Sequence, residues 1–458
     1  MTGMGKKIVI AGAGASGMMA AIAAAGGLSE MDGEQGQDAA ERGQDKGPAA
    51  GYGFARPEDI CILEKNERAG RKLLATGNGR CNFTNAKCTS WDYSGAFLLK
   101  KETSGFPDSV MVQAPPKRVM EAFFRMGILP REEDEGRVYP YSGQGSSICQ
   151  ALYSKLASLG VEIRCGSVLK RAEALPGGGF HLTLRDGSEL TCERLILAVG
   201  GKAGCQYGSE GDGYALAREL GHGVVKPIPA LVQLTVDDPD LPSLKGVRVK
   251  ARAALFEGSE KIRDDRGEIQ FTEDTLSGIC IFNLSRYVRY SGNPVSAPER
   301  YHVGIDFMEE YPEETVLAIL RLRQEYLGQR EARAFLSGVL HEKLAAVFMQ
   351  KLGIPAGRKT AELREEDLAA LAAMLKNFDV KITGTKSWKD AQVTAGGVDT
   401  AEIHRRTLES KLIPGLYFAG ELIDVDAPCG GYNLQWAFAS GMVAGKAAGM
   451  VPGTAGRD

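Results

Sequence analysis

The sequence predicts an α/β protein into which a β-rich and helical domain is inserted, and three observations lead to this fold class. Near the N-terminus, the short apolar run 7–11 is followed by closely spaced glycines and by a run of small residues. The segment 226–385 has another pattern, first of short β-rich pieces and then of charged helices. The last segment returns to apolar strands that end in glycines. We therefore expect a first domain built from 1–225 and 386–458, with 226–385 inserted between its two parts.

The composition is that of a globular protein. Its 55 Lys and Arg against 58 Asp and Glu leave a formal net charge of −3, which argues against nucleic-acid binding because such proteins usually carry a basic surplus. The nine cysteines include no CxxC pair, and the five histidines have no metal-ligand spacing. We therefore expect a cytoplasmic protein with free thiols and without a metal site.

The uncharged stretch 8–29 allows two interpretations. It is long enough to cross a bilayer and is similar to the apolar part of a signal peptide. Ala and Gly dominate it, however, and Gly12, Gly14 and Gly17 have the G-x-G-x-x-G spacing between a strand and a helix. In a Rossmann-like domain such glycines allow a tight turn, the approach of a pyrophosphate, and close packing of helix on strand, with the anion at the helix N-terminus. We therefore expect a dinucleotide site and no membrane segment.

An acidic residue for a ribose hydroxyl is expected about 20 residues after these glycines. The next apolar strand, in DICILEK, instead ends at Glu64, 47 residues after Gly17. Residues 29–57 contain no Val, Ile or Leu and are rich in Gly, Gln and charges, so they are expected to form a flexible insertion that explains the spacing. Glu64 is then the ribose ligand, with an ordinary strand-end carboxylate as the alternative.

The segment after Glu64 is basic and then rich in glycine and amides. Lys65, Arg71 and Lys72 follow the ribose-binding strand and are candidates to meet phosphates, with solvated surface charge as the alternative. The loop GNGRCN, 77–82, exposes backbone and polar side chains that suit hydrogen bonds to a flat heterocycle; its candidate residues are Asn78, Gly79, Arg80, Cys81 and Asn82. Cys81 taken alone is better explained as a packed thiol.

The remaining segments complete the expected architecture. The alternating pattern 161–192 predicts a β-meander that leads into the buried parallel strand LILAVGG. Asp212 is either a helix N-cap or a ligand contact. The pieces of 226–310 predict a small barrel or sandwich, and 313–376 predicts helices. A diglycine then precedes a helix that begins near Asn433, which is a second anion-stabilising terminus.

In their order along the chain, GAGASG, Glu64, GRKLLATGNGRCNFTNA, GRVYP, LAVGGKAG, TAGGV and GLYFAGELIDVDAPCGGYNLQWAFASG resemble the BaiN/YhiN-type NAD(P)/FAD-dependent oxidoreductases. These are flavoproteins with two dinucleotide-binding domains. The sequence departs from the family pattern in the length of 29–57 and at Ala427, Pro428 and Cys429, where smaller polar residues are expected beside the flavin. The second departure bears on the substrate more than on the cofactor.

The resemblance implies FAD and a set of residues that contact it. Gly12, Gly14, Ala15, Ser16 and Gly17 would hold the pyrophosphate, Glu64 the adenosine ribose, and Val168 the adenine side through its backbone. The ribityl chain and the ring would be lined by Ala198, Gly200, Gly201, Gly420, Glu421, Gly430, Gly431, Tyr432, Asn433 and Leu434.

These residues lead us to expect an FAD-dependent oxidoreductase that moves hydride from NAD(P)H through flavin N5 to an electron-poor C=C of a small hydrophobic substrate. Tyr432 and Arg80 are the catalytic candidates because they fall beside the expected ring. One alternative is an amine oxidase that passes electrons to oxygen, and another is a flavoprotein associated with RNA modification. The sequence predicts no oligomeric state.

Overall fold

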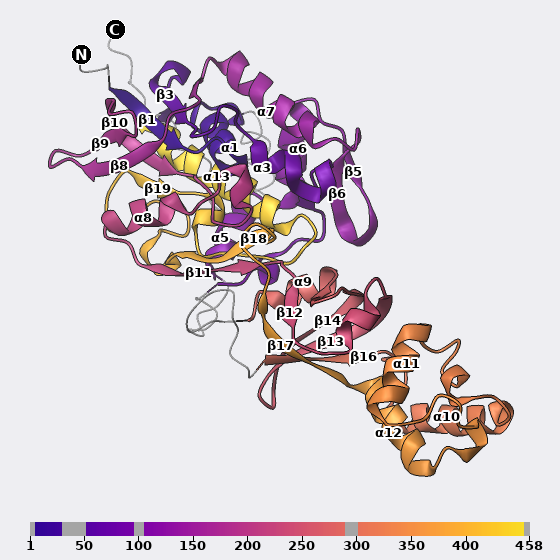
Figure 1. Ribbon diagram of the computed structural model, residues 1–458. Coiled ribbons are helices and arrows are strands. Elements are labelled where there is room, and N and C mark those ends of the chain that lie inside the picture. The colour runs from indigo at the N-terminus through magenta and orange to yellow at the C-terminus, as the bar shows by residue number, and fades with distance from the viewer. Residues whose placement is uncertain (1–4, 30–51, 96–104, 289–300, 453–458) are drawn as a thin grey trace, which may run out of the picture. The chain divides into compact units, whose positions relative to one another are not determined.

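The computed structural model describes residues 5–29, 52–95, 105–288 and 301–452 (Figure 1). The chain divides into two compact units. Unit one consists of residues 1–227 and 393–458, and unit two of residues 228–392. The domain limits expected from the sequence, 225 and 385, stay a prediction.

Unit one is built on a seven-stranded sheet. Its strands follow the order β7 (Glu162–Arg164), β3 (Ile60–Leu63), β1 (Lys6–Ala11), β10 (Glu189–Leu197), β9 (Phe180–Leu184) and β8 (Leu169–Ala174), and β19 (Leu416–Phe418) also pairs with β10. β7, β3, β1, β10 and β19 are parallel, whereas β8 and β9 form an antiparallel meander with the first half of β10. The expected meander thus consists of β8, β9 and the first half of β10, and β10 continues into the buried parallel strand. The expected range 161–192 begins too early, because β7 pairs parallel with β3 and is not part of the meander. This arrangement confirms the predicted Rossmann-type α/β fold.

Two parallel helices pack closely in unit one, α1 (Ala15–Ala24) and α13 (Tyr432–Gly449). Glycines at every fourth position of α13, Gly441, Gly445 and Gly449, face carbonyl groups of α1, at Ser16, Ala20 and Ala24 respectively, and a Cβ at any of the three would overlap with them. Each α13 glycine lies one turn after the last and meets α1 one turn further on, so the helices run in the same direction.

The other elements of unit one cover the sheet and its edges. They are helices α3 (Arg71–Ala75), α5 (Gly105–Gln113), α6 (Pro116–Arg125), α7 (Gly145–Leu159) and α8 (Asp212–Glu219), and the small sheet of β4 (Thr84–Asn85), β6 (Arg137–Pro140) and β5 (Pro130–Glu132). The stretch 8–29 contains most of β1 and all of α1. In the described part of the chain, no helix has both the length and the hydropathy that a membrane span needs.

The insertion expected at 29–57 is too long at its C-terminal end. Residues 30–51 lie outside the described residues, but β2 (Tyr52–Phe54) pairs with β20 (Met450–Pro452), and a 3-10 turn covers Pro57–Asp59. Phe54 also packs against Gly26, since a Cβ on that glycine would lie 2.8 Å from the ring. Composition alone did not reveal this strand because a three-residue edge strand carries little periodicity.

Unit two contains a closed six-stranded barrel, which confirms the predicted barrel-like insertion. Its strands are β12 (Leu234–Val236), β15 (Thr275–Ser277), β14 (Glu260–Phe271), β13 (Arg248–Glu257), β16 (Tyr301–Asp306) and β17 (Phe378–Thr385), with helix α9 (Ile279–Ser285) beside them. The chain enters along β11 (Val224–Ala230) and leaves before β18 (Val393–Val398), and these two strands pair.

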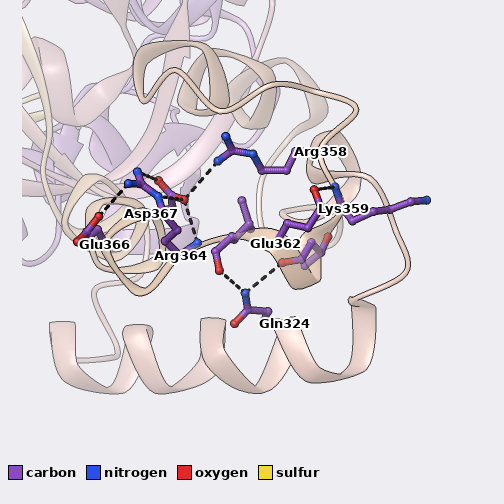
Figure 2. Close-up of polar contacts among 9 residues, drawn as sticks. Gln324, Arg358, Lys359, Glu362, Arg364, Glu366 and Asp367 are labelled. Carbon is purple, nitrogen blue, oxygen red and sulfur yellow. Dashed lines mark hydrogen bonds and ion pairs between the residues drawn. The ribbon is translucent and has the colours of Figure 1, made fainter.

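Three helices complete unit two, α10 (Glu313–Leu327), α11 (Glu342–Lys351) and α12 (Glu365–Lys376). Within the segment 313–376, for which helices are expected, residues 331–341 have apolar residues at helix spacing but form no α-helix. Residues 332–334 form a 3-10 turn, and α11 begins only after His341. Figure 2 shows the polar contacts that connect α10 to the start of α12. There the buried Asp367 accepts hydrogen bonds from the backbone and guanidinium of Arg364, and Gln324 donates to the carbonyl groups of Thr360 and Leu363.

Candidate functional site

The three glycines of the N-terminal motif are required for different reasons. Gly12 has φ +101°, and a Cβ there would lie 2.5 Å from the Ala198 carbonyl oxygen, while a Cβ on Gly17 would overlap with the Gly12 carbonyl. Packing of the protein against itself therefore explains both. Gly14 has φ −86°, and a Cβ there would meet nothing within 4 Å. The fold therefore leaves open space beside Gly14, at the N-terminus of α1, where a dinucleotide-binding loop meets its pyrophosphate.

Glu64 lies directly after β3 and is buried, with 7% of its surface exposed. One carboxylate oxygen accepts a hydrogen bond from the Ala13 amide at 2.9 Å, and the other accepts from the backbone and side chain of Asn66 at 2.8 and 2.6 Å. Glu64 therefore connects the glycine loop to the end of the neighbouring strand. The sequence prediction placed it beside this loop, and its role as ribose ligand stays a prediction.

The basic candidates after β3 all have partners within the protein. Lys65 contacts Asp212 at 2.8 Å and Glu210 at 2.9 Å. Arg71 donates to Asn66 and to the Gln206 carbonyl, and Lys72 pairs with Glu421 at 2.6 Å. The proposed N-cap role of Asp212 is wrong, because Gly211 is the N-cap of α8 and Asp212 is the first helical residue. Its carboxylate instead raises the pKa of Lys65.

The loop 77–82 is an exposed turn with a buried end. Gly77, Asn78, Gly79 and Cys81 all have positive φ, in the left-handed region that favours glycine. Gly77, Asn78 and Gly79 are exposed, whereas Cys81 is fully buried, and burial raises its pKa to about 12. Cys81 is thus a packed, protonated thiol, as the alternative interpretation has it.

Arg80 and Asn82 have contrasting surroundings. The Arg80 guanidinium pairs with Glu133 and lies 4.0 Å above the ring of Tyr139. The Asn82 side chain is buried, and its carbonyl oxygen has no hydrogen-bond partner. That oxygen faces Gly431, whose Cβ would come within 2.6 Å of it. An unsatisfied buried acceptor is costly, so this site lacks a donor that a bound N–H group would supply.

The ends of β10 and β19 bring a third group of candidates together. A Cβ on Gly201 would lie 2.9 Å from the Glu421 carboxylate, and one on Gly420 would lie 2.5 Å from the Ser16 hydroxyl. Glu421 accepts from the Thr394 amide at 2.7 Å in addition to Lys72. Three further candidates lie in this region. Ala198 and Gly200 follow the end of β10, where the Ala198 amide donates to the carbonyl of Ala11 at the end of β1. Ala15 is the first residue of α1.

Val168 lies just before β8, at the edge of the described site. Its carbonyl accepts from the Arg185 amide at 2.9 Å, and the amide of the preceding Ser167 donates to the Glu64 carbonyl at 2.8 Å. The segment that carries Val168 is therefore attached to the end of β3 through Glu64.

The start of α13 forms the far part of the site, and we call residues 426–432 the α13 turn. Gly430 and Gly431 have φ of +124° and +97°, and Gly431 is the N-cap. The half-buried Tyr432 begins the helix, and burial raises the pKa of its phenol. The side-chain amide of Asn433 already has partners within the protein, because it accepts from the Ala427 amide and donates to the Ala427 carbonyl. Leu434 is partly buried and packs on the core.

Three residues that the sequence reasoning missed hold this turn and the start of α13. Asn85 donates to the Gly430 carbonyl at 2.8 Å, and the Tyr93 hydroxyl donates to the Tyr432 carbonyl at 3.0 Å. Thr84 donates to Gln435 at 2.6 Å in a fully buried pair. Asn85 and Thr84 lie in the FTNA part of the motif after the 77–82 loop, so the motif itself was the available signal. Tyr93 has no such signal.

The close packing of α1 on α13 determines how far apart the two helix N-termini lie. Gly441 contacts Ser16 near the start of α1, and α13 begins nine residues earlier, at Tyr432. This corresponds to about 13 Å along the axis at about 1.5 Å per residue. Both termini direct their free N–H groups the same way, so the site offers two anion-stabilising positions to one elongated ligand.

The residues present fit a dinucleotide such as FAD. The open space beside Gly14 would receive the pyrophosphate, and the unpaired Asn82 oxygen beside the α13 turn would accept an N–H of a heterocycle. Contacts within the protein connect part of the predicted set, from the glycine loop through Glu64, Gly420 and Glu421, while the contacts of the predicted residues with a cofactor stay predictions.

Comparison with known proteins identifies the family. A family model described as HI0933-like protein Rossmann domain matches residues 49–447. A 3-dehydro-bile acid delta(4,6)-reductase from Clostridium scindens is 35% identical over 97% of this chain and 100% of that protein. A ribosomal RNA dihydrouridine synthase from Escherichia coli is 29% identical over 83% of this chain and 90% of that protein. Among solved structures, a 3-ketosteroid delta1-dehydrogenase from Sterolibacterium denitrificans is 12% identical with a TM-score of 0.46, over 96% of this chain and 99% of that chain.

The family model covers most of the chain, and the Clostridium scindens relative aligns with nearly all of it. The predicted family, its Rossmann-type fold and its class as FAD-dependent oxidoreductases are confirmed. The chain belongs to the HI0933-like Rossmann-domain family of flavoproteins.

Proposed function

We propose that the protein reduces an electron-poor C=C, conjugated to a carbonyl group, of a small hydrophobic substrate, with NAD(P)H as the electron donor. The observation that carries the proposal is the 35% identity, over 97% of the chain, to a protein named as a bile acid delta(4,6)-reductase. The site supports it because its two halves fit FAD. When bound, FAD accepts a hydride equivalent from one partner and delivers it to another.

The chain's own residues would hold this cofactor at three places. The α1 N-terminus and Gly14 would receive the pyrophosphate, Glu64 the ribose, and the α13 turn with Asn82 the ring. The free N–H groups at the start of α13 would favour negative charge at the ring edge, which supports two-electron chemistry.

Tyr432 is the proposed proton donor to the substrate carbon. Burial raises the pKa of its phenol, so the hydroxyl stays protonated at neutral pH and is able to donate. Arg80 is the weaker catalytic candidate, because its charge is already paired with Glu133 and it packs on Tyr139. We assign Arg80 an orienting role at the edge of the 77–82 loop.

Two measurements test the proposal. Purified protein is expected to be yellow and to release FAD, not FMN, on denaturation. Under anaerobic conditions, NADH or NADPH should bleach the flavin, and a conjugated steroid ketone such as 4-androstene-3,17-dione should restore its colour. A colourless protein that cannot be reconstituted with FAD would contradict the cofactor assignment. Bleaching without reoxidation by the ketone would contradict the substrate class alone.

A second candidate function is the reduction of a uracil ring in RNA, favoured by the 29% identity to a ribosomal RNA dihydrouridine synthase. The C5=C6 bond of uracil is also an electron-poor C=C conjugated to a carbonyl, so the same site chemistry would serve. Reoxidation of the reduced protein by RNA and not by the ketone would favour this candidate. The formal net charge of −3 weighs against it.

A further inference from the structure

Residues 88–94 are firmly attached to the α13 turn. The Ser94 amide donates to the Asp426 carbonyl at 2.7 Å, and the Asp426 amide donates back at 2.9 Å. The hydroxyl of Tyr93, which is 1% exposed, donates to the Tyr432 carbonyl, and the Cys88 sulfur lies 3.2 Å from that hydroxyl. The segment therefore has a defined position beside the proposed ring end of the site.

Hydrogen bonds also fix the backbone of residues 89–92 within this segment. Residues Ser90–Asp92 form a 3-10 turn, and the Asp92 carboxylate accepts from the backbone and hydroxyl of Thr89 at 2.8 and 3.0 Å. The Ser90 hydroxyl donates to Asp108 of α5 at 3.0 Å. The backbone of this turn therefore needs little ordering when a ligand contacts it.

Trp91 occupies the middle of this turn and is 81% exposed. The neighbouring Asp92 is close enough to the Tyr432 phenol to raise its pKa, so the turn lies near the proposed proton donor. An exposed indole on a fixed turn is a large apolar surface that gains free energy when a ligand covers it, and tryptophan is enriched among residues that dominate binding.

We propose that Trp91 is a specificity-determining residue that packs against the apolar ring system of the substrate. This inference rests on the proposed function, which requires a hydrophobic substrate at the α13 turn. Tyr93 is the positioning residue that keeps the Trp91 turn beside Tyr432. The chemistry that Trp91 recognises is the apolar, polycyclic part of a conjugated ketone.

The test uses the FAD-loaded full-length protein and 4-androstene-3,17-dione as the probe. Without NAD(P)H, the ketone is titrated into oxidised protein, and the shift of the flavin absorption band gives Kd. Trp91→Ala should raise Kd about tenfold by loss of the covered apolar area, whereas Trp91→Phe should keep Kd within about threefold of wild type. FAD content and kcat at saturating ketone should stay unchanged in both. Tyr326→Ala, which removes a side chain that is 79% exposed on α10 of unit two, is the matched control and should leave Kd unchanged.

The outcomes separate this inference from the proposed function. If wild-type protein binds and reduces the ketone but Trp91→Ala changes Kd by less than about twofold, the role of Trp91 is overturned and the proposed function stands. If Tyr326→Ala weakens binding as much as Trp91→Ala, the effect is a general one of surface apolar residues and the inference also fails. If wild-type protein neither binds nor reduces the ketone, both fail.

Discussion

Gly445 of α13 lies directly against the carbonyl oxygen of Ala20 in α1, so closely that a Cβ at position 445 would overlap with this oxygen. The contact is the middle one of three that keep the two helices parallel and in one register. It determines the distance between the glycine loop at the start of α1 and the α13 turn. The two halves of the proposed site, which lie more than 400 residues apart in the sequence, therefore depend on a helix contact outside the site.

Replacing Gly445 with Val should separate these helices. A branched side chain at this contact forces both backbones apart, which typically costs about 1–3 kcal/mol or more of unfolding free energy. Denaturant unfolding followed by circular dichroism measures this loss, and FAD affinity should fall with it. Ala447→Val, at a partly buried position of the same helix, is the control and should have a much smaller effect. Equal effects of the two substitutions would show that the contact is unimportant.

Gly14→Val should abolish FAD retention and leave the fold intact. Apart from its chain neighbours, no protein atom lies within 4 Å of an added Cβ, and φ is negative, so we expect the side chain to collide with a bound ligand and not with the protein. The measurement is the flavin-to-protein ratio after purification, with thermal unfolding as the check on folding. Gly177→Val is the control, because that glycine also has open space but lies in the turn between β8 and β9. Stoichiometric flavin in Gly14→Val would contradict the placement of the pyrophosphate beside Gly14.

Tyr432→Phe tests the proposed proton donor. Removal of the hydroxyl should slow reoxidation of the reduced protein by the ketone by about 10²-fold or more, the usual size of a general-acid contribution. Reduction by nicotinamide should be unaltered because it needs no proton from this group. Stopped-flow absorbance of the two half-reactions measures both rates. Unchanged reoxidation would reduce Tyr432 to a packing residue.

His222 should make stability depend on pH. It is 3% exposed, its Nε2 lies 2.8 Å from the Ser410 hydroxyl, and burial lowers its pKa. Because the unfolded chain then binds the proton more readily, the free energy of unfolding should fall as pH drops below about 6.5. In His222→Phe this part of the pH dependence should vanish, whereas substitution of the exposed His404 by Asn should preserve it. Denaturation midpoints between about pH 7.5 and 5.5 give the comparison, and identical slopes in all three proteins would refute the prediction.

The insertion should be removable only up to β2. Its composition cannot build a core, so deletion of 31–50 with a short Gly-Ser linker should leave FAD content and thermal stability nearly unchanged. The contact of Gly26 with Phe54 brings the flanking residues together, so a short linker suffices. Deletion of 31–54 also removes β2 and its pairing with β20, and should lower the melting temperature. A large stability loss in the shorter deletion would mean that the segment packs on the rest of the protein.

The sequence alone predicts an element correctly wherever a local pattern of residues is enough to define that element. The spacing of Gly12, Gly14 and Gly17 between an apolar strand and a helix predicts the strand–turn–helix that the structure contains, and Glu64 follows the next strand as expected. The short β-rich pieces of 226–310 likewise predict a small barrel or sandwich, of which the structure has the barrel. Local patterns failed at Asp212, where the helix starts one residue earlier than an Asp cap implies, and at 331–341, where apolar spacing occurs without a helix.

Only the tertiary structure decided which residues complete the site. Sequence spacing cannot show that Lys72 pairs with Glu421, that Tyr93 holds Tyr432, or that the Asn82 oxygen is left without a donor, because each depends on segments that are distant in the chain. The same holds for the distinction between Gly14 and its two neighbours. The motif requires all three glycines, but only the packing shows that Gly12 and Gly17 serve the protein's own backbone while Gly14 faces open space. Local patterns determined the elements and the chemistry of the loops, whereas the close approach of α1 and α13 determined where those loops meet.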